Sequence, residues 1–200
     1  MCGRVTQPNR ADIVNAVEEM FEKPLTIGAL ASEVSLSRSI VEAGEMISVV
    51  VEINDELILS AMHWGYPSPY DDGDLLFNTR LETASDKKMW KLDFQRRRCL
   101  IPVDSFWEQR VEFAANDTAP LMMGGLFSKS SHRYSKNPAS PNVRNVSMFT
   151  MPSLGLVKTY RDRQPAMIPS PVAAAWLDRD RYSEQVVATL AHRQRLIVVG

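Results

Sequence analysis

The first residues of the chain carry two adjacent reactive groups. The sequence opens Met1-Cys2-Gly3-Arg4, and aminopeptidases remove an initiator methionine that precedes a small residue such as cysteine. The processed chain would then begin with a free α-amine beside a thiol. The α-amine has a pKa of about 8 and the thiol one of about 8.5, so both groups are partly reactive near neutral pH.

A 1,2-aminothiol of this kind reacts with aldehydes in two steps. The amine forms a Schiff base with the carbonyl carbon, and the thiol then adds to that carbon and closes a five-membered thiazolidine ring. Because both groups belong to one residue, ring closure is intramolecular and fast. The alternative is that Cys2 stands second in the chain without a chemical role, and the tetrapeptide alone favours that alternative.

Two segments further along the chain combine polar groups with apolar runs. Residues 77–83 read Phe-Asn-Thr-Arg-Leu-Glu-Thr, a polar cluster beside an apolar stretch. Residues 98–108 form a strand-like run that ends in two aromatics and one carboxylate, Glu108. The structural alternatives are a surface carboxylate for Glu108 and an ion pair between Arg80 and Glu82.

Taken together, these segments resemble the SOS-response-associated peptidase (SRAP) family, whose members crosslink covalently to abasic sites in single-stranded DNA. The matching blocks recur in family order across most of the chain, and they are specific together although each alone is weak. They are Cys2-Gly3-Arg4, Trp64-Gly65-Tyr66, Asn78 with Arg80 and Glu82-Thr83-Ala84, the run 98–108, and Asp162-Arg163-Gln164-Pro165. The resemblance implies a single SRAP-like domain over residues 1–200.

The resemblance also implies roles for individual residues. Cys2 matches the nucleophile that links to the abasic sugar, and Glu108 matches the acidic residue that handles protons during ring opening and Schiff-base formation. A carboxylate near the amine can move protons through the carbinolamine and the imine. The residues that match polar positions around the DNA backbone are Arg4, Asn78 and Arg80, with the hydroxyl of Thr150 near the pocket. Arginine suits such positions because it pairs with phosphates through two hydrogen bonds.

Several positions depart from the family's pattern, among them Ile40, Ala43, Tyr70, Gln109 and Arg161. Ile40 stands where the family has an asparagine that contacts the active cysteine, and isoleucine has no hydrogen-bonding group. Arg161 replaces a histidine, and because arginine stays protonated near neutral pH it cannot act as a general base. Arg161 can still bind a phosphate of the DNA. Gln109 replaces a tryptophan that commonly follows the glutamate.

The sequence therefore predicts an abasic-site sensor that forms a covalent thiazolidine crosslink to single-stranded DNA through Cys2 after removal of Met1. Two alternatives stay open. One is a degenerate DNA-binding relative with little or no crosslinking activity, because Ile40 and Arg161 replace family active-site residues. The other is a thiol peptidase, a hydrolase whose cysteine serves autoprocessing. No cofactor is expected for any of these activities.

Composition narrows the possible partners. The chain has 200 residues, of which 44% are hydrophobic and 24% charged, as is ordinary for globular proteins. Its net charge of -1 means that a nucleic-acid role requires a local basic surface. Two cysteines are too few for a disulfide framework or a zinc site, and the three histidines, His63, His132 and His192, show no ligand spacing. We expect a cytoplasmic protein without a metal or a membrane segment and favour a monomer, although nothing in the sequence fixes its oligomeric state.

One basic run has two interpretations that the sequence does not separate. Arg96-Arg97-Arg98 precedes the strand-like run. Such a cluster is typical of a strip that faces nucleic-acid phosphates, and it is equally typical of a solvated surface turn.

The elements that position these residues are expected to be mostly strands. Apolar residues at helical spacing predict a helix that starts near Asn9, capped by Asn9 or Asp12. Met46–Ile53 and Glu56–His63 flank a short Asn-Asp turn and predict a hairpin. Further expected strands are 98–104, 106–113, 120–127, 145–152 and 194–199, with helices at 171–177 and 183–191 and an exposed loop at 128–142. The pattern indicates an α+β fold with a mixed, largely antiparallel sheet or open barrel core and a few peripheral helices.

Overall fold

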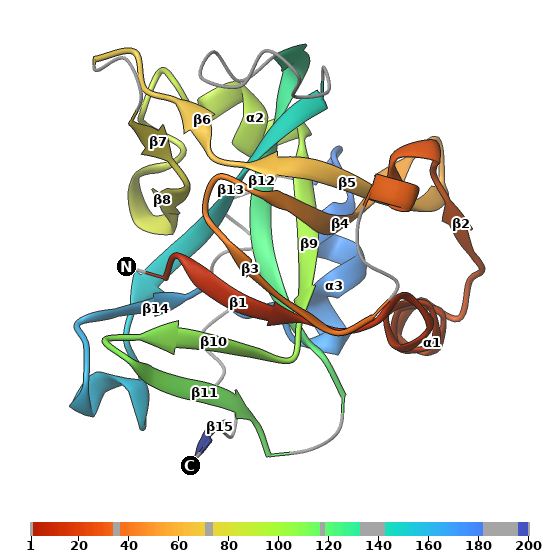
Figure 1. Cartoon of the computed structure of the whole chain (residues 1–200). Coiled ribbons are helices and arrows are strands. Elements are labelled where there is room, and N and C mark those ends of the chain that lie inside the picture. Colours follow the sequence, from red (N-terminus) through yellow and green to blue (C-terminus); the bar gives the residue numbers. More distant parts are fainter. Residues whose placement is uncertain are drawn as a thin grey trace.

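Strands account for most of the regular secondary structure in the described residues, and three α-helices lie around them (Figure 1). The computed structural model describes residues 2–33, 37–70, 74–116, 119–132, 143–181 and 196–199. Its helices are α1 (Arg10–Phe21), α2 (Lys91–Arg96) and α3 (Ser170–Leu177), with short 3-10 turns η1 (Ala29–Glu33), η2 (Leu81–Thr83) and η3 (Val157–Thr159). Its strands are β1 (Arg4–Gln7), β2 (Leu25–Ile27), β3 (Ser39–Glu42), β4 (Met46–Ile53), β5 (Glu56–Trp64), β6 (Tyr66–Pro67), β7 (Leu75–Leu76), β8 (Asn78–Arg80), β9 (Arg98–Val103), β10 (Ser105–Glu108), β11 (Val111–Ala115), β12 (Leu121–His132), β13 (Val143–Pro152), β14 (Arg163–Pro165) and β15 (Leu196–Val199).

Five strands close into a barrel at the centre of the molecule. Neighbours in the order β13-β12-β9-β4-β5 pair antiparallel. The ring closes because β5 also pairs with β13, in parallel, through His63 opposite Asn145 and Trp64 opposite Val146. The predicted α+β fold with a largely antiparallel core is therefore confirmed, and the open barrel of that prediction is a closed one. Strands β14, β8 and β2 extend it at its sides.

A second sheet lies against the barrel. Its strand β1 begins two residues after Cys2, and its strand β10 ends at Glu108. Its strand order is β15-β11-β10-β1-β3, and every neighbouring pair is antiparallel. Figure 1 shows it below the barrel, with the N-terminus at the left edge. Val5 pairs with Phe106. Because the two strands are antiparallel, the same register places Glu108, the last residue of β10, beside Gly3, which follows Cys2.

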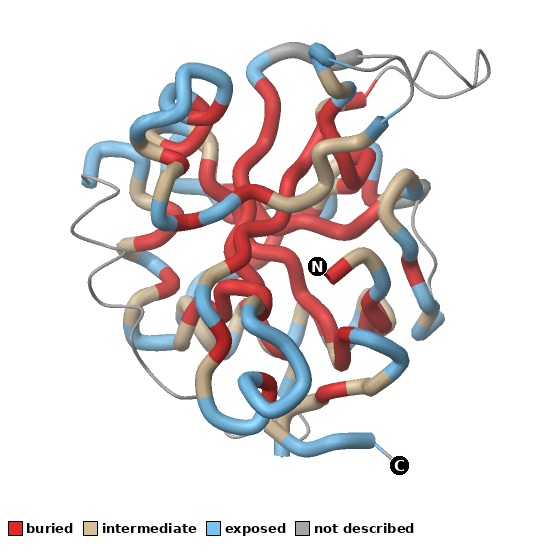
Figure 2. Tube along the Cα trace, turned by 90° about the vertical axis from the view of Figure 1, so that its left-hand side faces the viewer, coloured by how far each residue is buried: buried red, intermediate tan, exposed pale blue. Residues whose placement is uncertain are grey.

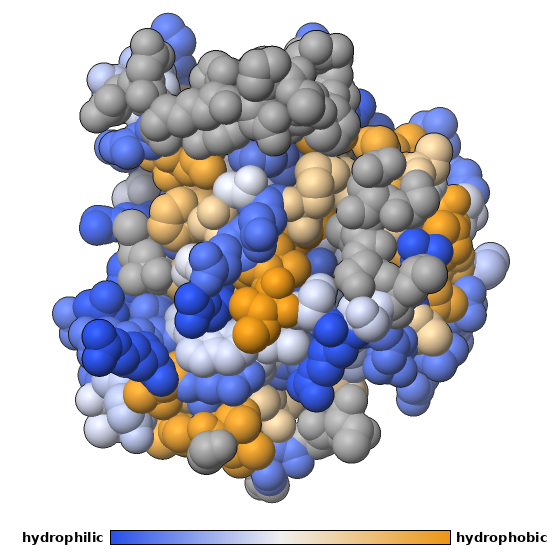
Figure 3. All heavy atoms as spheres, in the orientation of Figure 1, coloured by the Kyte–Doolittle hydropathy of each residue, from blue (hydrophilic) through white to orange (hydrophobic). Residues whose placement is uncertain are grey.

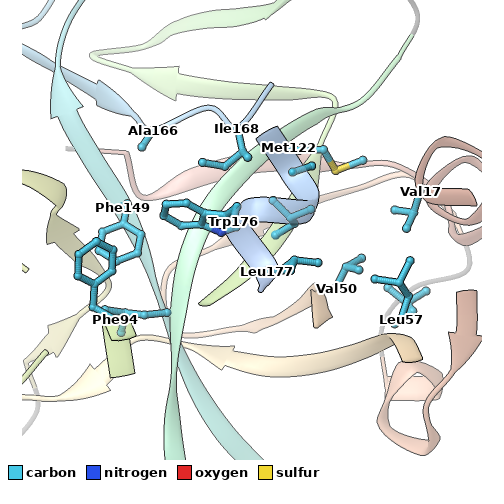
Figure 4. Close-up of a cluster of buried hydrophobic side chains, with 14 of the residues drawn as sticks. Val17, Val50, Leu57, Phe94, Met122, Phe149, Ala166, Ile168, Trp176 and Leu177 are labelled. Carbon is cyan, nitrogen blue, oxygen red and sulfur yellow. The ribbon is translucent and has the colours of Figure 1, made fainter. Parts of the chain in front are cut away.

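Buried side chains fill the space between the barrel and its covering helices. Figure 2 shows that burial follows the barrel strands where they cross. In the cluster of Figure 4, Trp176 of α3 packs edge-on against Phe149 at 5.6 Å between ring centroids, and Phe94 lies 5.1 Å from Phe149. A Cβ atom on Gly124 would lie 2.7 Å from the Trp176 ring, so glycine lets this helix approach the barrel.

Most of the predicted elements are confirmed. Helix α1 begins after Asn9, whose side chain accepts a hydrogen bond from the Asp12 amide at 2.9 Å. The hairpin of β4 and β5 turns at Asn54-Asp55, which both have positive φ. The helix predicted at 171–177 and the strand at 194–199 appear as α3 and β15.

The structure differs from the predictions at several places, including residues 24–45, which were expected to be irregular but contain β2 and β3. The strand predicted at 106–113 is split into β10 and β11 by a turn at Gln109 and Arg110, where φ is 51° and 74°. Strand β12 runs on to His132, so the predicted loop begins later than residue 128. Helix α2 was not predicted, because its six residues are too few to show a clear helical period. The predicted helix 183–191, residues 133–142 of the predicted loop and His192 lie outside the described residues.

Candidate active site around Cys2

The thiol of Cys2 lies in the interior of the protein. Its residue is 0% exposed, and its Sγ atom donates a hydrogen bond to the Arg4 carbonyl at 3.6 Å. Burial, and secondly the negative charge of Glu108, raise the pKa of this thiol to about 12. The thiol is therefore protonated at neutral pH, and a base must remove its proton before the sulfur can bond to carbon.

Asn78 holds the backbone of Cys2 from the neighbouring strand β8. Its Nδ2 atom donates to the Cys2 carbonyl at 2.7 Å, and β8 is fixed on the barrel by the pairing of Asn78 with Met148. Its Oδ1 atom is buried and has no hydrogen-bond partner in the described part of the chain. A buried acceptor of this kind costs about 1–3 kcal/mol when it stays unpaired, so Asn78 is suited to accept a hydrogen bond from a group that enters the site.

Glu108, at the end of β10, is the buried carboxylate of the site. It is 2% exposed, and its Oε2 atom lies 3.4 Å from Nε of Arg161, whose side chain is 41% exposed. With its amide oxygen turned towards Arg161, Gln109 accepts from Nη1 of that arginine at 3.0 Å and donates to the Tyr160 carbonyl at 3.3 Å. Gln109 and Arg161, the two residues here that are expected from the sequence to depart from the family's pattern, therefore contact each other beside Glu108.

A groove lined by arginines opens next to this carboxylate. It encloses about 610 Å³ and is lined by Arg80, Pro152, Arg161, Asp162 and Arg163; we call it the arginine groove. In Figure 3, strongly hydrophilic side chains gather at the left of the molecule, below the N-terminus and over β14. Such a concentration of positive charge favours an anionic ligand.

The arginines of the groove differ in how firmly they are held. Arg163 donates to both carboxylate oxygens of Glu82 at 2.8 Å, and to the carbonyl of Thr150 at 2.8 Å. These bonds lower the pKa of Glu82. Arg80 is exposed, and its side chain makes no ion pair or hydrogen bond with any described residue. The sequence allowed an ion pair between Arg80 and Glu82, but Glu82 pairs with Arg163 instead. The Arg80 side chain is therefore left available to a ligand.

Thr150 lies under the groove rather than on its surface. It is 1% exposed, and its Oγ1 atom accepts hydrogen bonds from Nε and Nη2 of Arg163, both at 3.2 Å. Its hydroxyl therefore positions Arg163. The sequence reasoning did not include Arg163 among the site residues, although it belongs to the matched block 162–165; a hydroxyl and a carboxylate far apart in the sequence give no local sign that they share one arginine.

Two of the expected residues lie apart from the groove. Arg4 pairs with Glu42 across β1 and β3, with Nε 2.8 Å from Oε1, and both side chains are about half exposed. Ile40 is 58% exposed and lies opposite Thr6 on β3. An apolar patch over β3 is visible in Figure 3. The structure does not bring Ile40 to Cys2, whose hydrogen bond from an amide side chain comes from Asn78.

The described residues contain no group of three or more His, Cys, Asp or Glu side chains that could hold a metal ion. Among the helices that the structure describes, none combines the length and the apolar character needed to cross a membrane.

Comparison with known proteins identifies the family. The family model named SOS response associated peptidase (SRAP) matches residues 1–198. The chain belongs to the SRAP family. The abasic site processing protein YedK of Escherichia coli is 24% identical over 189 residues, which cover 90% of this chain and 81% of YedK. YoaM of Bacillus subtilis, also named an abasic site processing protein, is 22% identical over 206 residues, which cover 95% of this chain and 85% of YoaM.

Solved structures share the SRAP chain's fold. A phage-related protein of Bordetella bronchiseptica superposes with a TM-score of 0.72 at 22% identity, covering 99% of this chain and 94% of that one. A protein of Bacteroides thetaiotaomicron has a TM-score of 0.73 at 14% identity, covering 100% and 92%. The barrel and the sheet beside it are thus an architecture that distant sequences retain.

Proposed function

We propose that this SRAP protein processes abasic sites in single-stranded DNA by forming a thiazolidine crosslink through Cys2, once Met1 has been removed. The observation that carries the proposal is the placement of Asn78 and Glu108 around Cys2, beside a groove lined by arginines. The relatives named as abasic site processing proteins support the substrate class.

The first step joins the α-amine of Cys2 to the open-chain aldehyde of the abasic sugar. The nitrogen lone pair adds to the carbonyl carbon and gives a carbinolamine. Protonation of its hydroxyl group then releases one water and leaves an imine. Glu108 is the buried carboxylate beside Cys2 that can donate and take back these protons.

The second step closes the ring. The sulfur of Cys2 adds to the imine carbon, and the thiol proton moves to the nitrogen. Because burial and Glu108 raise the pKa of the thiol to about 12, the thiol does not ionise by itself near neutral pH. We assign the transfer of this proton to Glu108. The step forms a carbon–sulfur bond and needs neither an oxidant nor a reductant.

The arginine groove would hold the phosphates beside the lesion. The Arg80 side chain makes no hydrogen bond or ion pair with a described residue, and it offers a fork of donors to a phosphate. Arg161 bridges the groove and Glu108. Because it keeps its charge at neutral pH, Arg161 can bind an anion and fix the carboxylate, but it cannot exchange a proton.

Two other activities predict different behaviour at Cys2. A thiol peptidase uses the thiolate as its nucleophile, and the raised pKa of Cys2 works against that activity. A protein that only binds DNA would need no reactive amine at Cys2. This DNA-binding candidate is favoured by Arg161, which stands where the resemblance implies a histidine.

The test uses protein freed of Met1, verified by intact mass, and single-stranded DNA with one abasic site. We expect a band of protein joined to DNA on a denaturing gel, and none with C2A. Cys2→Ser keeps the amine but lacks the thiol, so it should give only an imine, and borohydride should reduce this imine to a stable amine that survives denaturation. Cys99→Ala is the matched control, because Cys99 is also buried but lies in the barrel. An adduct with C2A as abundant as with the unaltered protein would show that Cys2 is not the linking residue. Binding without adduct would favour the DNA-binding candidate.

A further inference from the structure

A second concentration of positive charge lies away from Cys2, where β12 ends and β13 begins. A pocket of about 270 Å³ is lined there by six basic side chains, Arg96, Arg97, Arg98, Lys129, Arg144 and Arg179. Glu52 is the one carboxylate among its described lining residues. We call it the basic pocket. Six of the chain's 23 lysines and arginines thus gather in one place, although the whole chain has a net charge of -1.

Hydrogen bonds to other protein groups hold two of these arginines in place. Arg98 is buried, and its guanidinium donates to the carbonyls of Phe94 at 2.9 Å and Trp176 at 2.6 Å, which ties together the ends of α2 and α3. Burial lowers its pKa only to about 10, so it stays charged at neutral pH. Arg97 donates to Asp93 at 2.6 Å. Of the run Arg96-Arg97-Arg98, these two residues are therefore structural.

Three other cations line the pocket without forming an ion pair with a described residue. Arg96 comes from α2, Lys129 from β12 and Arg144 from β13, and none of them makes a hydrogen bond or ion pair with a described residue. The Arg144 guanidinium lies over the Phe127 ring, 5.4 Å from its centroid, which limits where it can point. Cations that converge from three elements repel one another unless an anion lies between them.

We propose that the basic pocket binds a phosphate group, with Arg96, Lys129 and Arg144 as its ligands. Its volume lies just below the range of about 300–1,000 Å³ that is typical of pockets for drug-sized molecules. It therefore suits a phosphate and the sugar attached to it better than a large ligand. Two sources offer this chemistry: a backbone phosphate of a bound DNA strand, and free phosphate.

Strand β13 sets the spacing between the basic pocket and the arginine groove. Arg144 lies near its start and lines the basic pocket, while Pro152 ends it and lines the arginine groove. In Figure 1 the start of β13 is at the top, beside α2, and β14 at its other end lies below the N-terminus. Eight residues at about 3.3 Å each separate the two by roughly 26 Å. A duplex strand advances about 3.4 Å per phosphate, and an extended single strand advances further, so a single strand of at most roughly eight nucleotides spans the two sites.

The first experiment titrates inorganic phosphate into the full chain. We expect saturable binding, weakened about tenfold by R96Q or K129Q, which is the loss expected for one charge-assisted hydrogen bond. Both side chains are exposed and lack protein partners among the described residues, so the fold should tolerate either change. Lys91→Gln is the matched control, because Lys91 is an exposed cation on the same helix but does not line the pocket.

The second experiment measures the affinity of undamaged single strands of increasing length. If the source is DNA, affinity rises with strand length up to roughly eight nucleotides, by which length one strand reaches both sites, and R96Q or K129Q removes that gain. Phosphate binding without a length effect identifies free phosphate as the source. Variants that match K91Q with both probes overturn the proposal. Neither probe contains an aldehyde, so failure of crosslinking at Cys2 does not affect this result.

Discussion

The Nε atom of Arg161 lies 3.4 Å from Oε2 of Glu108. Arg161, which stands where the sequence resemblance implies the family's histidine, thus contacts the carboxylate to which we assign the proton transfers. The contact holds the carboxylate in place. Arginine keeps its positive charge at neutral pH, whereas a histidine at this position would titrate near neutral pH.

Arg161→His is expected to accelerate both formation and reversal of the crosslink. Histidine can give and accept a proton at neutral pH. A decrease of about 1.4 kcal/mol in the activation free energy corresponds to a tenfold increase in rate. A time course of adduct formation, followed by transfer to competing abasic DNA, measures both directions. Arg161→Lys keeps the charge without the proton exchange and serves as the control. If R161H is no faster than R161K, Arg161 is not a lost proton carrier.

Ile40→Asn is expected to leave the crosslinking rate unchanged. Ile40 is exposed and lies opposite Thr6, while the amide hydrogen bond to the Cys2 carbonyl comes from Asn78. The same time course tests this, with Asn78→Leu as the comparison that removes the hydrogen bond. A rate increase with I40N alone would mean that β3 approaches the site during the reaction.

Arg80→Ala is expected to weaken binding of single-stranded DNA and to lower its dependence on salt. A phosphate contact releases counterions, so losing one should reduce the slope of log K against log salt by about 0.7 for a single strand. Fluorescence anisotropy at several salt concentrations gives both quantities. Lys91→Gln, outside the arginine groove, should leave the slope unchanged. Equal slopes for R80A and the unaltered protein would place the contact elsewhere.

The sequence predicted the local features of the fold because their causes are local. Asn9 caps α1, and Asn54-Asp55 suit a turn that needs positive φ at both positions. The turn at Gln109-Arg110 has the same backbone requirement, but neither residue type is typical of it. The split between β10 and β11, which ends β10 at Glu108, was therefore invisible in the sequence.

Features that depend on distant residues could not be predicted from the sequence. Barrel closure requires β5 to pair in parallel with β13, and no periodicity records which strands become neighbours. The same limit applies to the site. The motifs pointed to Cys2, Asn78 and Glu108 through a family resemblance, whereas the hold of Glu82 on Arg163 and the burial of Arg98 within a basic run depend on tertiary contacts.

The last prediction concerns the protonation of Cys2. Burial and Glu108 raise the pKa of its thiol to about 12 in the folded protein, against about 8.5 in an unfolded chain. Between these values the folded state binds a proton that the unfolded state has lost, so the contribution of Cys2 to stability falls as pH rises above about 8.5. Chemical denaturation at pH values from about 7 to 10 should therefore show a loss of unfolding free energy that is smaller in C2A. Tyr66 and Cys99 also have raised pKa values, and they remain in both proteins, so the comparison isolates Cys2. If the unfolding free energies of the two proteins fall in parallel with pH, the Cys2 thiol ionises as easily in the folded state as in the unfolded one. A Cys2 thiolate would then be accessible, and the thiol peptidase would again be a candidate.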